Sequence, residues 1–213
     1  MLSQSPWQTY TYADTLGWGD LLTQYNGQTI TYDEIGNPIN YRNGMTMSWQ
    51  AGRQLESITQ NGKTYNFTYA HDGLRTKKSI TSGNTTVDVN YIYEGDKLLQ
   101  MTYDNYVLTF SYDANGIPVS FHVKNATLDK DYYYGTNSRG DIEVIYNADG
   151  TLHARYDYDA YGKILGVTAP DGTNITAPYA IANLNPLRYR SYVYDNETGL
   201  YYLQSRYYDL AQG

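Results

Sequence analysis

Two short patterns, Tyr-Asp and Asn-Gly or Asp-Gly, recur along this chain and constrain its fold more than any other feature. Tyr-Asp occurs seven times, starting at Tyr32, Tyr103, Tyr112, Tyr156, Tyr158, Tyr194 and Tyr208. Equivalent aromatic residues (Tyr12, Tyr32, Trp49, Tyr69, Tyr93 and Tyr112) are separated by 20, 17, 20, 24 and 19 residues. A repeat of this length predicts one β-hairpin per unit, because two strands of ordinary length and their turns fill it.

The Asn-Gly and Asp-Gly pairs predict the turns between these strands. There are seven, starting at Asn26, Asn43, Asn61, Asp72, Asn115, Asp149 and Asp171. Such pairs adopt positive φ in tight hairpin turns. The segments between them alternate in character: in residues 63–70, Tyr65, Phe67 and Tyr69 share one face and polar residues share the other. We expect similar strands over 28–32, 45–50, 85–93, 106–113, 141–146 and 152–158, no amphipathic helix, and a long connection over 166–185.

The predicted fold class is therefore all-β, built from consecutive antiparallel hairpins. The chain has 27 Tyr but only 3 Phe and 3 Trp among its 213 residues. A Tyr ring packs like an apolar side chain, and its hydroxyl still bonds to water or a polar neighbour, which suits a half-wet sheet face. Two architectures fit this composition: a sheet that stands as a wall with water on both sides, and a compact Tyr-rich sandwich or barrel.

Charge and composition exclude several functions. No apolar run approaches the length of a membrane span, and the first residues lack the basic and apolar segments of a signal peptide. The chain has no Cys, its three His residues lie far apart, and no calcium-loop pattern occurs, so we expect no metal or cofactor. Its net charge of -7 comes without a basic stripe, so we expect no nucleic-acid ligand.

Several stretches resemble the tyrosine-aspartate (YD) repeat of the RHS family. These are residues 32–38 (YDEIGNP), 112–118 (YDANGIP) and 52–55 (GRQL). From Tyr132 onward the chain resembles the RHS repeat-associated core domain, through residues 132–141 (YYYGTNSRGD), 156–162 (YDYDAYG), 185–190 (NPLRYR) and 199–209 (GLYYLQSRYYD). The resemblance divides the chain into degenerate YD repeats over 1–131 and a truncated core domain over 132–213.

The resemblance implies a strip of hairpins that spirals into a hollow shell, as in bacterial polymorphic and Tc toxins and in animal teneurins. In toxin members the shell encloses a C-terminal toxic segment, so the implied partners are the rest of the shell and this cargo. The implied location is secreted or cell-surface. The function that we expect for this chain is encapsulation or presentation of a C-terminal segment.

The same family's core domain is an aspartyl autoprotease whose cleavage signature reads Asp-Pro-x-x-Gly-Arg. The matching residues here are Asp209 to Gly213, with Leu210 in place of Pro. The resemblance makes Asp209 and Arg206 candidate catalytic residues in a longer protein only, because an aspartyl protease needs two carboxylates and the family's second one lies beyond residue 213. We therefore do not expect this chain by itself to be an enzyme.

One binding function stays open beside the shell. Exposed Tyr and Trp stack on sugar rings, so a carbohydrate-binding or adhesion module at the cell surface is the main alternative; it predicts a local aromatic cluster with an open groove. Residues 139–141 spell Arg-Gly-Asp, a cell-adhesion tripeptide, but the family places a turn there.

Overall fold

The computed structural model describes residues 9–12 and 21–209, and nearly all of the regular structure in this part of the chain is β-strand. One sheet has fourteen strands in the order β17 to β4, so each strand lies beside its neighbours in sequence, and β4 and β17 are its two ends. The predicted all-β fold of consecutive antiparallel hairpins is confirmed.

Two compact units make up the chain. Unit 1 comprises Met1–Thr68 and Ser79–Thr86, and unit 2 comprises Tyr69–Lys78 and Val87–Gly213. The division between repeats and core domain at residues 131 and 132 stays a prediction based on the resemblance.

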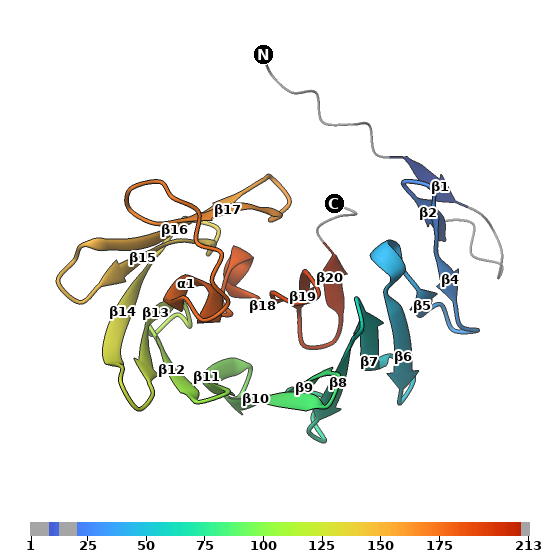
Figure 1. Cartoon of the computed structure of the whole chain (residues 1–213), viewed down its shortest axis with the longest axis horizontal. Helices are drawn as coiled ribbons and strands as arrows, with labels where there is room; N and C mark the ends of the chain where they lie inside the picture. Colours follow the sequence, from blue (N-terminus) through green and yellow to red (C-terminus); the bar gives the residue numbers. More distant parts are fainter. Residues whose placement is uncertain (1–8, 13–20, 210–213) are drawn as a thin grey trace, which may run out of the picture. The chain divides into compact units, whose positions relative to one another are not determined.

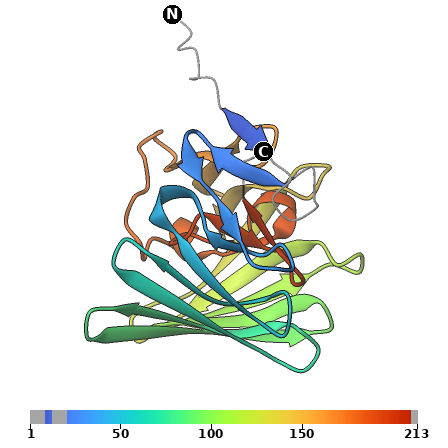
Figure 2. The same cartoon turned by 90° about the vertical axis from the view of Figure 1, so that its right-hand side faces the viewer.

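Unit 1 consists of short strands followed by longer hairpins, and Figure 2 shows β6 to β8 side by side. Tyr65 and Phe67 on β8 are buried and Asn66 is exposed, which confirms the alternation predicted for this strand. Its elements are β1 (Tyr10–Tyr12), β2 (Leu22–Tyr25), β3 (Gln28–Thr29), β4 (Thr31–Tyr32), β5 (Pro38–Asn40), a 3-10 turn (Arg42–Gly44), β6 (Thr46–Gln50), β7 (Gln54–Gln60) and β8 (Lys63–Tyr69).

Three strands contribute to both units: β8, whose last residue Tyr69 belongs to unit 2, β9 (Arg75–Ser82) and β10 (Thr85–Glu94). The rest of unit 2 comprises β11 (Lys97–Tyr103), β12 (Tyr106–Tyr112), β13 (Pro118–Lys124), β14 (Asp129–Thr136), β15 (Ile142–Asn147), β16 (Leu152–Tyr158), β17 (Ile164–Thr168), α1 (Ile181–Leu184), the 3-10 turn η2 (Tyr189–Ser191), β18 (Val193–Asp195), β19 (Leu200–Tyr202) and β20 (Tyr207–Asp209).

The Tyr-Asp repeat has a recurring turn geometry. At Asp33, the main-chain N–H donates to the carbonyl of Asn37 at 2.9 Å, and the carboxylate accepts from the N–H groups of Ile35 and Asn37. Asp113 forms the same turn, closed by its bond to the carbonyl of Ile117. The Asp carboxylate therefore stabilises its own turn by accepting main-chain N–H groups, which explains why Asp follows Tyr at the end of a strand.

Only some of the Gly pairs form the predicted tight turns. Both residues have positive φ in the pairs that begin at Asn26, Asn43 and Asn61. In the pairs that begin at Asp72, Asn115, Asp149 and Asp171, only the Gly does. These four Gly residues lie in the longer turn described above, whose closing bond spans five residues, so the prediction of two-residue turns is wrong there.

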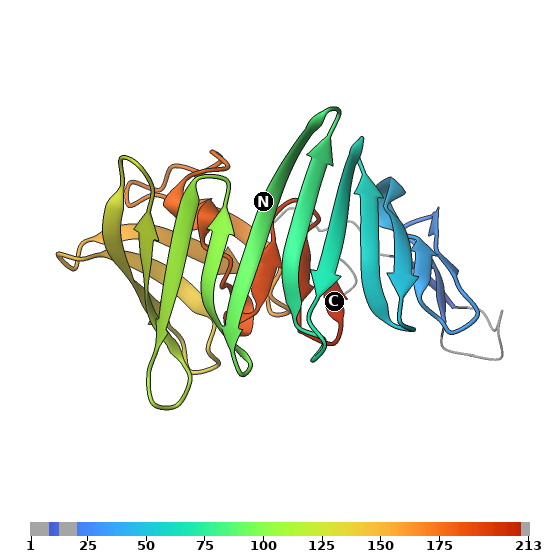
Figure 3. The same ribbon diagram turned by 90° about the horizontal axis from the view of Figure 1, so that it is seen from below.

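In unit 2 the sheet curves around a C-terminal segment that runs from α1 to β20 (Figure 1). Figure 3 shows β10 to β14 lying side by side in sequence order. On β13, Phe121 and Val123 are buried while Lys124 is exposed. The ring of Phe121 stacks on rings of both neighbouring strands: its centroid lies 6.3 Å from that of Phe110 and 5.3 Å from that of Tyr132. This aromatic ladder joins β12, β13 and β14 on the inner face.

Two inner phenols of unit 2 donate their hydroxyls to main-chain carbonyls, one in the C-terminal segment and one on a neighbouring strand. Tyr156 donates to the carbonyl of Ala182 at 2.6 Å, and Tyr158 donates to that of Ile142 at 2.8 Å. For these two tyrosines the polar neighbour of the hydroxyl is a main-chain carbonyl, whereas Tyr134 donates to the side-chain oxygen of Asn185. The predicted connection over 166–185 is partly wrong, because β17 extends to Thr168 and α1 forms one helical turn near its end.

Candidate functional site

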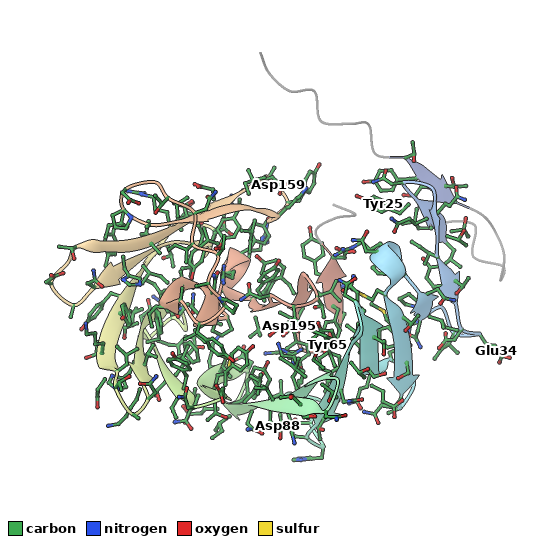
Figure 4. The ribbon with its side chains drawn as sticks, viewed as in Figure 1. Tyr25, Glu34, Tyr65, Asp88, Asp159 and Asp195 are labelled. Carbon is green, nitrogen blue, oxygen red and sulfur yellow. The ribbon has the colours of Figure 1, made fainter. Side chains whose placement is uncertain are left out.

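Four charged residues from opposite ends of unit 2 meet on the inner face of its sheet. Arg75 and Lys78 lie at the start of β9, Asp195 ends β18, and Glu197 follows in the next turn. We call these four residues the ionic clamp. Figure 4 shows Asp195 inside the curve of unit 2, whereas Asp88 lies on its outer side.

The contacts of the clamp are short and centred on Asp195. The Arg75 guanidinium donates to both carboxylate oxygens, at 2.6 Å from Nη1 to Oδ2 and 3.0 Å from Nη2 to Oδ1. Lys78 Nζ donates to Asp195 Oδ1 and to Glu197 Oε2, each at 2.8 Å. Two cations therefore face two anions, and Arg75 binds the Asp195 carboxylate in a bidentate geometry.

Tyrosines surround the Arg75 side chain, which is 0% exposed. Its Cζ atom lies 4.8 Å from the ring centroid of Tyr91 and 4.5 Å from that of Tyr202. Its guanidinium also donates to the hydroxyls of Tyr91 and Tyr207, each at 3.3 Å. Ring faces and hydroxyls thus replace the water that this cation loses on burial.

The electrostatics of the clamp favour the charged states of Asp195 and Lys78. Burial opposes ionisation of Asp195, but Arg75 and Lys78 outweigh it and lower the pKa of this carboxyl to about 2. Burial likewise opposes protonation of Lys78, and Asp195 and Glu197 raise its pKa above the ordinary value. A buried, balanced ion-pair network of this kind fixes the position of the segments that carry it.

In the sequence, Asp195 belongs to one more Tyr-Asp dipeptide, and nothing there points to its partners Arg75 and Lys78. Asp33 and Asp113 cap their own turns, whereas Asp195 is 1% exposed and binds side chains from β9. Arg75 and Lys78 are three residues apart, which strict strand alternation places on opposite faces. Both are nevertheless buried, so the spacing gives no sign of their common partner.

A second buried arginine supports the same segment. Arg188 is 0% exposed, stacks with its Cζ 4.3 Å from the Tyr156 centroid, and donates to the carbonyls of Ala182 and Asn185 at 2.8 and 3.1 Å. It therefore bonds the end of α1 and packs it against β16. Arg188 is the first Arg of the stretch 185–190 (NPLRYR) that resembles the core domain, but its burial was not evident from the sequence.

The Arg-Gly-Asp tripeptide forms the expected turn, with Gly140 at φ 81°. The carboxylate of Asp141 is 1% exposed and accepts hydrogen bonds from Arg139 Nε at 3.1 Å and from the Arg190 main-chain N–H at 3.0 Å. This buried carboxylate therefore anchors η2 through the Arg190 N–H. It is not presented on an exposed loop, as an adhesive tripeptide would be.

The two predicted protease residues lie at either end of β20. Arg206 is exposed in the turn before the strand, and Asp209 ends it, opposite Leu200 on β19. Leu210 and Gly213 of the cleavage signature lie outside the described residues. The catalytic roles of Asp209 and Arg206 stay predictions for a longer protein.

Within residues 9–12 and 21–209, no group of three or more His, Cys, Asp or Glu side chains is arranged to hold a metal ion. The helices of the same residues include none with the length and apolarity needed to span a membrane.

Sequence comparison finds relatives among bacterial proteins. No family model matches the chain. It is 35% identical over 199 residues to the tRNA nuclease WapA of Bacillus subtilis strain 168, and 35% identical over 199 residues to the tRNA3(Ser)-specific nuclease WapA of Bacillus spizizenii. Each alignment covers 90% of this chain and 8% of the relative, so the chain spans a small part of these proteins.

Structure comparison finds similar folds in Tc toxin complexes. A chain of the Photorhabdus luminescens Tc holotoxin pore matches with a TM-score of 0.65 and 18% identity, over 95% of this chain and 11% of that one. A chain of the TcdB2-TccC3 crystal structure matches with a TM-score of 0.64 and 19% identity, over 95% of this chain and 12% of that one. Together with the hairpin order, these likenesses support an RHS-type fold.

Proposed function

We propose that this chain is a wall segment of an RHS-type toxin shell that encapsulates or presents a C-terminal effector segment. The observation that carries the proposal is the ionic clamp, which joins β18 and the turn after it to β9 through buried bonds of 2.6 to 3.0 Å. A wall that must hold a downstream segment needs such an attachment, because hairpin pairing alone joins only strands that are neighbours in sequence.

The likeness to Tc toxin chains and to WapA supports a toxin-related role, and with it export from the cell. The nuclease activity in the names of the WapA relatives belongs to proteins of which this chain matches 8%. In this proposal the chain forms part of the shell wall, and any catalytic activity toward RNA belongs to another part of such proteins.

A chimera tests the proposal. Residues 1–213 of this chain replace the matched stretch of B. subtilis WapA, and limited trypsin digestion then follows the release of the WapA C-terminal segment. The expected result is protection equal to that in unaltered WapA, and faster release when the chimera also carries Asp195→Leu. A folded chimera whose C-terminal segment is digested at the same rate with and without the clamp rejects encapsulation by this wall.

Autoproteolysis is a separate proposal that rests on Asp209 and Arg206. It is tested by extending the chain through a complete core signature with its second Asp and comparing it with Asp209→Asn and Arg206→Gln on a denaturing gel. We expect cleavage of the extended chain and intact variants. Uncleaved product from all three proteins rejects a catalytic role.

A further inference from the structure

The Asn-Gly pairs of this chain differ in chemical reactivity, because the structure places them in different turns. They begin at Asn26, Asn43, Asn61 and Asn115. An Asn that precedes Gly deamidates when the main-chain nitrogen of the Gly attacks the side-chain amide carbon, and Gly allows this attack because it has no Cβ. The reaction therefore needs an Asn side chain that can rotate and a Gly nitrogen that is not engaged in a hydrogen bond.

Asn115 lies in the longer turn of the Tyr-Asp repeat, where the nitrogen of the next residue is engaged. The N–H of Gly116 donates to the carbonyl of Asp113 at 3.0 Å. The side chain of Lys97 also crowds this glycine, since its Cε atom lies 2.8 Å from the position that a Cβ on Gly116 would take. The turn therefore holds the nitrogen that would attack the Asn115 side chain.

Two of the two-residue turns hold the Asn side chain instead. Asn26 Oδ1 accepts a hydrogen bond from the main-chain N–H of Thr9 at 2.9 Å. Asn43 Oδ1 accepts from Gln28 Nε2 at 3.4 Å, and the Asn43 N–H donates to Gln28 Oε1 at 2.6 Å. The carbonyl of Asn43 also accepts from Gln60 Nε2 at 3.4 Å. These bonds restrict the rotation that brings the amide carbon to the next nitrogen.

Asn61 has neither form of protection. It lies with Gly62 in the exposed turn between β7 and β8, after the last cross-strand pair, which joins Gln60 to Lys63. Within the part of the chain that the structure describes, no hydrogen bond holds the Asn61 side chain or the Gly62 N–H. Nothing lies within 4 Å of a Cβ placed on Gly62, so water reaches this turn.

We propose that Asn61 is a site of spontaneous deamidation and the most reactive of the four Asn-Gly pairs. The Gly62 nitrogen loses its proton to water and forms a bond to Cγ of Asn61. The bond from Cγ to Nδ2 breaks, ammonia leaves, and a cyclic succinimide remains. A water molecule then opens the ring at either carbonyl and gives Asp or isoaspartate at position 61. This inference goes beyond the shell proposal and does not depend on it.

The reaction changes the tip of the β7–β8 hairpin. Both products add a negative charge there, and isoaspartate also adds a carbon atom to the main chain. Asn61 and Gly62 both have positive φ, as a tight two-residue turn requires. Since such a turn fixes the register of its hairpin, we expect isoaspartate to weaken the pairing of Gln60 with Lys63.

Peptide mapping by mass spectrometry tests the proposal on the full chain. The protein is incubated at mildly alkaline pH, and the replacement of the amide by a carboxylate is followed at all four pairs. We expect Asn61 to deamidate at least ~5-fold faster than Asn26, Asn43 or Asn115, because each of those must first break a hydrogen bond. In concentrated urea the turns are lost, so the four rates are expected to converge.

Gln28→Ala provides a matched variant with a gain of reactivity. It removes both side-chain bonds to Asn43 and none at Asn61, so Asn43 is expected to deamidate faster while Asn61 keeps its rate.

Three results overturn the proposal. The first is a native rate at Asn61 no higher than that at the other three pairs. The second is an equal excess at Asn61 in urea, which would assign the difference to neighbouring sequence rather than to the turns. The third is an unchanged rate at Asn43 in folded Gln28→Ala. The comparison in the wild-type chain needs no variant, so the test stands even if Gln28→Ala perturbs folding.

Discussion

The guanidinium of Arg75 on β9 donates two hydrogen bonds, of 2.6 and 3.0 Å, to the carboxylate of Asp195 on β18, which lies 120 residues later in the sequence. The hairpin order of the sheet brings neighbouring strands together but does not determine where the C-terminal segment lies. The Arg75–Asp195 pair, together with Lys78 and Glu197, fixes the position of this segment against β9. Removing one partner leaves a buried charge without compensation, which makes the pair sensitive to single substitutions.

Asp195→Asn is expected to lower the free energy of unfolding by about 3–5 kcal/mol, because Arg75 and Lys78 then lose their shared anion. The measurement is urea unfolding followed by circular dichroism. Asp88→Asn is the matched control, since the Lys77–Asp88 pair is 38% and 43% exposed; such a pair contributes about 0–1 kcal/mol. Equal losses in the two variants contradict the account.

Lys78→Gln and Lys77→Gln compare adjacent residues of one strand. Lys78 is 5% exposed and bonds to two carboxylates, so its substitution is expected to lower the unfolding free energy by at least ~2 kcal/mol. Lys77 lies at the surface with one partner, so a loss below about 1 kcal/mol is expected. Thermal unfolding of both variants, with wild type in parallel, measures the difference. A Lys77 variant that is the less stable of the two rejects the assigned roles.

The clamp also predicts a pH dependence. Because the pKa of Asp195 is lowered to about 2 in the fold from an ordinary value of 3.8, its contribution is complete above about pH 5 and is lost as the pH falls toward 2. A shift of this size corresponds to roughly 2–3 kcal/mol. Unfolding free energies of wild type and Asp195→Leu, measured from pH 5 to pH 2, are expected to converge as the pH falls. A constant difference across this range contradicts an ionised Asp195.

Gly162→Ala is expected to destabilise unit 2 more than Gly172→Ala. Both glycines have positive φ, at 96° and 84°, so both substitutions carry the same backbone strain. A Cβ at Gly162 overlaps the ring of Tyr189, which is buried, whereas nothing lies within 4 Å of a Cβ at Gly172. The difference in melting temperature between the two variants isolates the packing of Tyr189 against the turn. Equal melting temperatures contradict close packing there.

The repeat pattern predicts most of the sheet because it is local. A Tyr-Asp dipeptide followed by Gly encodes both a strand end and a turn, and the structure places turns of this type at Asp33, Asp113 and Asp159. Alternation of apolar and polar residues likewise predicts which side of β8 is buried. Such signals need no knowledge of the rest of the chain.

The clamp could not be predicted in the same way, because it depends on contacts between residues far apart in sequence. Tyr194-Asp195 looks like every other copy of the dipeptide, yet its carboxylate binds β9 instead of capping a turn. Arg188 has a recognisable motif, but nothing local shows that the Tyr156 ring covers it. Contacts between distant parts of the chain determine the roles of these residues, so local sequence patterns do not reveal those roles.

Hydrogen exchange of the C-terminal segment measures whether the ionic clamp holds it against the sheet of unit 2. Residues 193–209 are compared by mass spectrometry with β10 to β16 of the same molecule. We expect wild-type β18 to β20 to exchange as slowly as the sheet, and we expect Asp195→Asn to accelerate their exchange while β12 to β16 stay protected. Rapid exchange of residues 193–209 in the wild type, with a protected sheet, would show that the clamp does not hold this segment and would contradict the account.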